Sequence, residues 1–245
     1  MISGLYTAAS GLMAQMAKME TLSQNLANAG TSGFKGDLLV VEGAGRRPLQ
    51  PALFVEEPAA SPQPVRIGRR VTDFGRGLIR ETQNPLDVAN SGSGYFVVQT
   101  PQGMGYTRAG NFAVDAKGYL RTPDGGSVQG KKGAIQVPNG RFSVDGSGRI
   151  LVEGREVDRL QIVDPDPTTL VRKDGSLFGL KPSAPEPPAA KTAEIRQGFL
   201  EASNVDPVGV MTQLMVSLRA SEAYQRAIHA LDQSLNQAAS ELGRI

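Results

Sequence analysis

The chain has 245 residues and a formal net charge of +2, with its Lys and Arg residues scattered along it. That balance creates no strong field for nucleic acid or an anionic membrane, so we expect neither as a partner. Cysteine is absent, which excludes disulfides and cysteine metal sites. No apolar run is long enough to span a bilayer, and the N-terminus has no basic start or unbroken apolar stretch. We therefore expect neither an integral membrane protein nor a cleaved signal peptide.

The segment from Ser3 to Asn28 is predicted to be an amphipathic helix. Apolar side chains recur every seven residues, with further apolar residues between them, which is the a/d pattern of a helical seam. The proposed seam residues are Leu5, Leu12, Met16, Met19, Leu22 and Leu26. Gly30 and Gly33 end the pattern, and Gly30 is placed to cap the last turn. The N-terminal helical segment is accordingly assigned to residues 1–33.

Residues 34–86 are interpreted as a long, partly extended connector. Asp37 to Glu42 is typical of a short strand, and short extended pieces are expected between Arg66 and Thr82. Five prolines between Pro48 and Pro64 break any long element. The cluster of Arg66, Arg69 and Arg70 is interpreted as part of a solvated loop.

Residues 87–181 are predicted to form a β-domain that contains an internal repeat. Strand-like runs occur at Tyr95–Gln99, Met104–Tyr106, Leu160–Val163 and Leu177–Leu180. The segment Phe112–Leu120 matches Phe142–Ile150 at an offset of 30 residues. In each copy an Asp opens a turn and a Gly can close it in the left-handed conformation, so each copy predicts a β-hairpin. Paired hairpins in one sheet or barrel are the favoured arrangement.

A Pro-rich linker is expected at residues 182–197, and the last module at residues 198–245. The segment from Asp206 to about Leu242 predicts a long helix, because Asp206 is a good N-cap and Pro207 suits the first helical position. Its apolar side chains recur at helical spacing. The residues of this second stripe are Leu214, Leu218, Tyr224, Ile228, Leu231 and Leu235.

The sequence thus predicts an α+β protein whose terminal helices pair as a coiled-coil module beside a central all-β, hairpin-rich domain of barrel or sandwich type. Two helices with apolar stripes leave surface uncovered, because neither can bury its stripe alone. One interpretation is an ordinary helical hairpin that closes a globular domain. The other, which we favour, is a self-association module completed by neighbouring molecules.

The sequence provides no recognisable catalytic, metal or cofactor site. His229 is the single histidine and lies within the C-terminal helix, with no second ligand or base nearby. No nucleophile elbow or phosphate loop occurs. The Gly-rich turns at Asp124 and Asp145 lack the alternating carboxylates of a calcium loop and are interpreted as turns. We therefore predict that the chain is not an enzyme and binds no cofactor.

Three stretches resemble the flagellar axial proteins of rod and hook. The first runs from Leu5 to Gly11, continues at Asn25, Leu26, Ala27 and Asn28, and ends with Gly33, Phe34 and Lys35. The second comprises Pro85–Ala89, Gly94–Val98 and Tyr106–Phe112. The third runs from Gly198 to Asp206 and includes Ser203, Asn204 and Val205. They follow in the order expected of the family over nearly the whole chain.

The resemblance implies a structural subunit of the bacterial flagellar basal-body rod, which spans the periplasm. In such proteins the terminal helices form the inner tube of a helical assembly that transmits torque. The implied partners are other copies of the chain, other rod and hook axial proteins, and the flagellar type III export apparatus. Pro85, Leu86 and Asp87 resemble the proximal rod subunit more closely, while Ile2 and Ser3 lean toward the distal one.

Two alternatives remain open. The chain could be a distal rod or hook-like axial protein of the same class. It could also be a secreted enzyme or glycan-binding β-module with a helical clamp, which predicts a stable monomer with a polar, concave site.

Overall fold

The computed structural model describes residues 2–43, 65–137 and 142–242. The chain is organised as two compact units that interleave along the sequence. The helical unit comprises Met1–Ala27, Asp37–Asp73 and Asp206–Ile245, and the β unit comprises Asn28–Gly36 and Phe74–Val205. The predicted α+β class, with a helix at each end and a β-rich centre, is confirmed.

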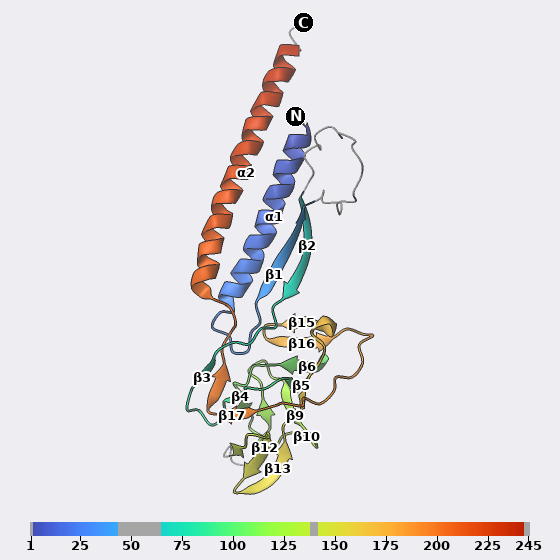
Figure 1. Ribbon diagram of the computed structural model, residues 1–245, viewed down its shortest axis with the longest axis vertical. Coiled ribbons are helices and arrows are strands. Elements are labelled where there is room, and N and C mark those ends of the chain that lie inside the picture. The colour runs from blue at the N-terminus through green and yellow to red at the C-terminus, as the bar shows by residue number, and fades with distance from the viewer. Residues whose placement is uncertain (1, 44–64, 138–141, 243–245) are drawn as a thin grey trace, which may run out of the picture. The chain divides into compact units, whose positions relative to one another are not determined.

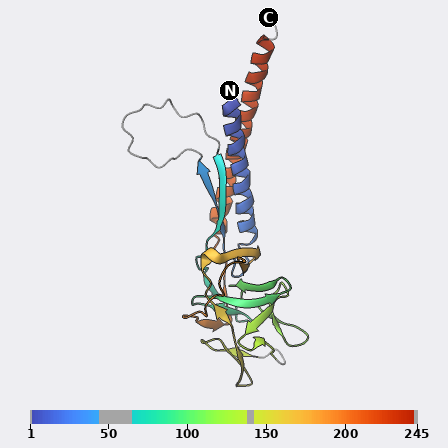
Figure 2. The same cartoon turned by 90° about the vertical axis from the view of Figure 1, so that its right-hand side faces the viewer.

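In the helical unit, α1 (Ile2–Ala27) and α2 (Pro207–Leu242) run side by side, as both Figure 1 and Figure 2 show. Both helices end within about one residue of the predicted bounds. The backbone N–H of Val208 donates to the Asp206 carboxylate at 3.1 Å, which is the expected N-cap bond. The coiled-coil geometry of the pair stays a prediction.

The connector contains more regular structure than the sequence suggested. β1 (Asp37–Gly43) and β2 (Val65–Thr72) form an antiparallel hairpin that packs against α1. The arginine cluster lies on β2 rather than in a loop. Arg70 donates to the Gln24 side chain of α1 at 2.9 Å and lies 3.6 Å from the Glu20 carboxylate. The prolines from Pro48 to Pro64 lie outside the described residues.

The β unit contains short strands around two apolar clusters, and every described strand pair in it is antiparallel. Their bounds are β3 (Ile79–Glu81), β4 (Val88–Asn90), β5 (Tyr95–Thr100), β6 (Gly103–Thr107), β7 (Ala113–Val114), β8 (Leu120–Arg121), β9 (Ser127–Gly130), β10 (Gly133–Ala134), β11 (Ser143–Val144), β12 (Arg149–Val152), β13 (Arg155–Arg159), β14 (Ile162–Val163), β15 (Leu170–Asp174), β16 (Leu177–Leu180), β17 (Ile195–Gln197) and β18 (Phe199–Glu201). The largest sheet has the order β15-β16-β6-β5-β9-β8-β7, with β10 beside β9 and β14 beside β5. One apolar cluster is centred on Phe96 and the other on Phe178, both fully buried.

The internal repeat forms two hairpins, as predicted. Asp115 accepts from the N–H groups of Lys117 and Tyr119, each at 2.9 Å, and Asp145 accepts from Ser147 and Arg149 at 3.0 and 2.9 Å. Gly118 and Gly148 close the turns with φ of 83° and 80°. The hairpins lie in different sheets, however: β7–β8 belongs to the large sheet, and β11–β12 forms a separate sheet with β13.

Two further expectations differ from the structure. Residues 182–197 are not simply a linker, because Ile195 is buried in the Phe96 cluster and β17 pairs with β4. The left-handed glycine after α1 is Gly33, with φ of 66°, rather than Gly30. A Cβ on Gly33 would also lie 2.2 Å from the backbone nitrogen of Ala109, so close packing excludes any side chain there.

Candidate assembly interface

The two helices approach closely where a small residue faces a large one. A Cβ added to Gly11 would lie 2.5 Å from the ring of Tyr224, whereas one added to Gly4 would lie 3.8 Å from Leu231. These facing pairs show that the helices run antiparallel. The buried side chains of the two helices are Ala8, Ala14, Thr21, Leu22, Asn25, Val210, Ser217 and Ser221.

The predicted seam residues do not all lie on the contact between the helices. Leu22 is buried, and nine others are partly buried: Leu5, Leu12, Met19, Leu26, Leu214, Tyr224, Ile228, Leu231 and Leu235. Met16 and Leu218 are 58 % and 52 % exposed. These two side chains therefore face solvent in the isolated chain.

Met16 and Leu218 belong to exposed rows of apolar residues. The spacing of apolar residues alone did not distinguish these rows from the contact between the helices. The α1 stripe consists of Tyr6, Met13 and Met16, and the α2 stripe consists of Val208, Met211, Met215 and Leu218. Steps of seven and three residues in α1, and of three and four residues in α2, place each set on one face of its helix. Contiguous apolar surface of this kind marks interaction sites in soluble proteins. Each helix therefore presents a second apolar face.

The β1–β2 hairpin adds exposed apolar surface to the helical unit. Val41 and Ile67 are opposite each other in the register, and both are exposed, as are Leu38 and Val40. Asn25 of the predicted motif holds the hairpin against α1. Its amide donates to the Asp37 carbonyl at 2.7 Å and accepts from the Asp37 N–H at 2.9 Å.

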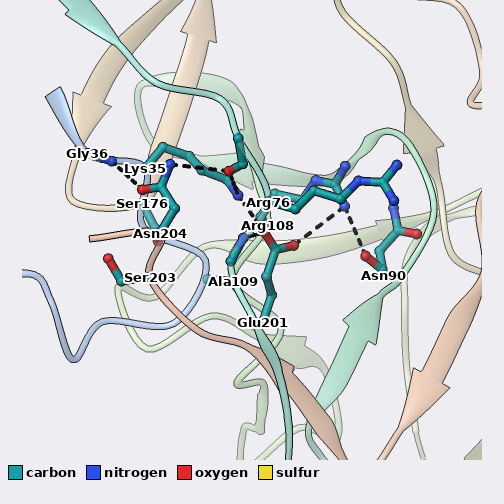
Figure 3. Close-up of polar contacts among 12 residues, drawn as sticks. Lys35, Gly36, Arg76, Asn90, Arg108, Ala109, Ser176, Glu201, Ser203 and Asn204 are labelled. Atoms are coloured by element: carbon teal, nitrogen blue, oxygen red, sulfur yellow. Dashed lines mark hydrogen bonds and ion pairs between the residues drawn. The ribbon is translucent and has the colours of Figure 1, made fainter. Parts of the chain in front are cut away.

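The β unit contains a buried charged cluster, the junction cluster, formed by Lys35, Arg108 and Glu201 (Figure 3). Lys35 forms an ion pair with Glu201 and donates to the Gly75 carbonyl at 2.9 Å. Arg108 lies 3.5 Å from the other Glu201 oxygen and donates to the carbonyls of Asn90 and Gly92 at 2.9 and 3.0 Å.

Backbone bonds join the segments that carry this cluster. The N–H of Gly33 donates to the Glu201 carbonyl at 2.7 Å, and the N–H of Asn204 donates to the Phe34 carbonyl at 3.3 Å. The Asn204 side chain accepts from Gly36 N–H at 2.7 Å and donates to the Gly75 carbonyl at 3.2 Å. The family-like residues near each end of the chain thus contact one another inside the β unit.

Burial changes the pKa of Arg108 within the cluster and of Tyr95 beside it. Desolvation lowers the pKa of Arg108, while the nearby Glu201 carboxylate opposes that change. The Tyr95 ring lies 5.2 Å from the Arg108 guanidinium, and burial raises the pKa of its phenol to about 12. Arg108 still stays protonated at physiological pH, because guanidinium pKa values start above 12.

Two hollows in the β unit bear on the enzyme alternative. One of about 470 Å³ is lined by residues that include Lys131, Arg159 and Ile162. Another of about 100 Å³ is lined largely by hydroxyl side chains, with Asp124 as the carboxylate in its lining. His229 is exposed on α2, and no three His, Cys, Asp or Glu residues of the described ranges gather as metal ligands. Within those same ranges, the helices are too short or too polar to cross a membrane.

Comparison with known families covers most of the chain. Residues 5–35 match the flagella basal body rod protein family, residues 89–176 match the flagellar hook protein FlgE/F/G D1 domain, and residues 196–241 match the flagellar basal body rod FlgEFG protein C-terminal family. The flagellar basal-body rod protein FlgF of Caulobacter vibrioides is 30 % identical over the full length of both chains. The chain belongs to the flagellar basal-body rod proteins.

Relatives named FlgF and relatives named FlgG are similar to this rod protein to about the same degree. FlgF of Salmonella typhimurium is 32 % identical, with 94 % of each chain covered, and FlgG of Caulobacter vibrioides is 32 % identical, with 98 % of this chain and 99 % of that protein covered. The α1 and α2 stripes lie within the first and last matched regions. The same two regions supply Lys35 and Glu201 to the junction cluster.

The motifs were recognisable from the sequence, whereas the charged cluster was not. Lys35 and Glu201 were each part of a motif, yet their partnership spans 166 residues. The signal that could have revealed the cluster was a charged residue inside each motif, among side chains that are otherwise mostly apolar or small. Because ionised side chains are rarely buried unless paired, such a residue needs an opposite charge from elsewhere in the fold.

Proposed function

We propose that this rod protein is a structural subunit of the proximal part of the flagellar rod and assembles through its terminal helices. The observation that carries the proposal is the pair of exposed apolar stripes on α1 and α2. A helix is stable in water when its apolar face is covered, and both helices keep such a face after packing on each other. Neighbouring subunits supply the missing surface.

Contacts between two different surfaces of neighbouring subunits explain how copies of one chain can build an axial structure. If the α1 and α2 stripes of a subunit contact different patches of its neighbours, the contacts are head-to-tail and need not close into a ring. Such contacts produce a helical filament. The interlocked helices then carry torque along the axis, and the β unit packs on the outside.

The decisive variant is Leu218→Asp. Leu218 is exposed, so the change leaves the contacts within the subunit in place and puts a charge into the subunit–subunit contact. Burying that unpaired charge costs several kcal/mol, so assembly and motility should be lost while the circular dichroism of the monomer is unchanged. Motility is measured in cells that lack their own copy of the chain.

Gln213→Asp is the matched control. Gln213 is exposed on the same helix, and helical geometry places it on the face opposite the α2 stripe. This variant should assemble and restore motility. Normal motility with Leu218→Asp would refute the assigned interface.

The proximal assignment is supported by the resemblance of residues 85–87 and by full-length similarity to FlgF. Similarity to FlgG is comparable, so the distal rod subunit is the competing assignment. Expression in cells lacking FlgF or FlgG separates them: the proposal requires restored motility in the first strain alone. Export through the flagellar type III apparatus, without cleavage of the N-terminus, and location in the basal-body rod belong to the same proposal.

A further inference from the structure

The junction cluster joins three charged side chains from distant parts of the β unit. Lys35 and Glu201 are only 1 % and 2 % exposed, and Arg108 is also buried. Lys35 comes from the loop that follows α1, Arg108 from the segment after β6, and Glu201 from the end of β18. The N–H of Gly77 also donates to the Glu201 carboxylate, at 3.1 Å. One carboxylate therefore serves two buried cations and a fourth chain segment.

The carboxylate is the last of these groups along the chain. Before residues 199–204 pack against the rest of the β unit, Lys35 and Arg108 would share a site that lacks the negative charge of Glu201. Apolar contacts accumulate gradually as a core forms, because each buried group contributes by itself. A charged cluster behaves differently, since a partly formed one leaves uncompensated buried charge. The completed state is therefore favoured over every partial one.

The neighbouring bonds extend the same dependence to both ends of the β unit. Gly33 and Phe34 bond to the backbone of Glu201 and Asn204, and Ala202 N–H donates to the Leu78 carbonyl at 2.8 Å. Loss of the Glu201 segment would remove partners from residues 33–36 and 75–78 together. Both of those segments lead directly along the chain to parts of the helical unit.

We propose that the junction cluster is a two-ended lock. Glu201 closes it: when its carboxylate is in place, residues 33–36, 75–78 and 201–204 are held as one piece. When the carboxylate is lost, all three segments open together although they are up to 171 residues apart, and the Lys35 amine becomes accessible. The lock makes the ordering of the segment after α1 depend on the segment before α2.

The test uses the soluble full-length chain, so its result does not depend on rod assembly. Glu201→Gln keeps the shape of the side chain and removes its charge. Lys35 is labelled with acetic anhydride, and the exposed Lys117 is the internal reference. Breaking a buried ion pair changes an opening equilibrium by roughly 100-fold or more. The rate of Lys35 labelling relative to that of Lys117 should therefore rise roughly 100-fold or more. Amide exchange should quicken at Gly33, Gly77, Ala202 and Asn204 together.

Glu81→Gln is the matched control, because Glu81 is an exposed carboxylate on β3, opposite Phe199 of β18. It should change neither labelling nor exchange. Lys35 labelling that stays at the wild-type level in Glu201→Gln would overturn the proposal. So would faster exchange confined to residues 201–204, because that result means that the two ends open separately.

A second pair of variants covers the case in which Glu201→Gln unfolds the whole β unit. Lys35→Met alone leaves one cation with one carboxylate, so it should open the lock less than Glu201→Gln does. Adding Lys35→Met to Glu201→Gln removes the buried cation that has lost the Glu201 carboxylate and should slow amide exchange at Ala202 again. A double variant that exchanges faster than Glu201→Gln would contradict the charge balance on which the lock rests.

Discussion

Single residues of the family motifs serve the fold of the chain itself. Asn25 and Asn204 each donate and accept at the same time, Asn25 with Asp37 and Asn204 with Gly36 and Gly75. A carboxylate at these positions could not donate, so aspartate would not replace either residue. Gly33 combines a positive φ with a backbone contact that excludes a side chain. These motif residues hold chain segments together.

The buried phenol of Tyr95 predicts that the β unit becomes less stable at alkaline pH. Burial raises the pKa of its phenol from 10.0 to about 12, so the folded β unit favours the neutral form. A group with a raised folded pKa contributes stability that is fully present below its unfolded pKa and is lost as the pH rises. Unfolding by urea should therefore become easier from pH 10 toward pH 12. In Tyr95→Phe this part of the pH dependence should be missing, and an unchanged profile would contradict the burial argument.

At the level of elements, the helices were predictable and most short strands were not. α1 and α2 contain long periodic patterns, so their existence and bounds follow from the sequence. β7 and β11 have two residues each, and only the repeated Asp and Gly turn residues revealed their hairpins. β17 and β18 were not predicted, because their partners β4 and β3 lie more than 100 residues earlier and Pro-rich sequence precedes them.

The close contact between α1 and α2 gives opposite predictions for two glycines. Gly4→Ala adds a methyl group in ordinary contact with Leu231, so helix propensity should raise the stability of the helical unit by about 0.5–1 kcal/mol. Gly11→Ala places the methyl group into the Tyr224 ring and should lower stability despite the same propensity gain. Thermal unfolding followed by circular dichroism at the helix band measures both. A stabilising Gly11→Ala would show that the helices do not approach there.

For the whole molecule, the order of segments along the chain hides its organisation. Each unit is assembled from separate stretches, and residues 28–36 and 37–73 belong to different units although they adjoin in sequence. Composition and periodicity divide a chain only into consecutive pieces, so they could not assign the connector to the helical unit or the segment after α1 to the β unit. The same limit applied to the interface: the predicted seams included Met16 and Leu218 but none of the other five stripe residues, and burial was needed to distinguish the stripes from the contact between the helices.

Protection of the α2 stripe in assembled rods tests the central claim most directly. The chain has no cysteine, so Met215→Cys places a single thiol on the stripe, at a position 66 % exposed in the isolated chain. Lys117→Cys, on an exposed turn of the β unit, shows whether a maleimide reagent reaches purified basal bodies. We expect rapid labelling of Met215→Cys in the monomer and at least a roughly tenfold slower reaction in rods, because a thiol buried in an interface is shielded from the reagent. Equal labelling rates in monomer and rod would contradict it.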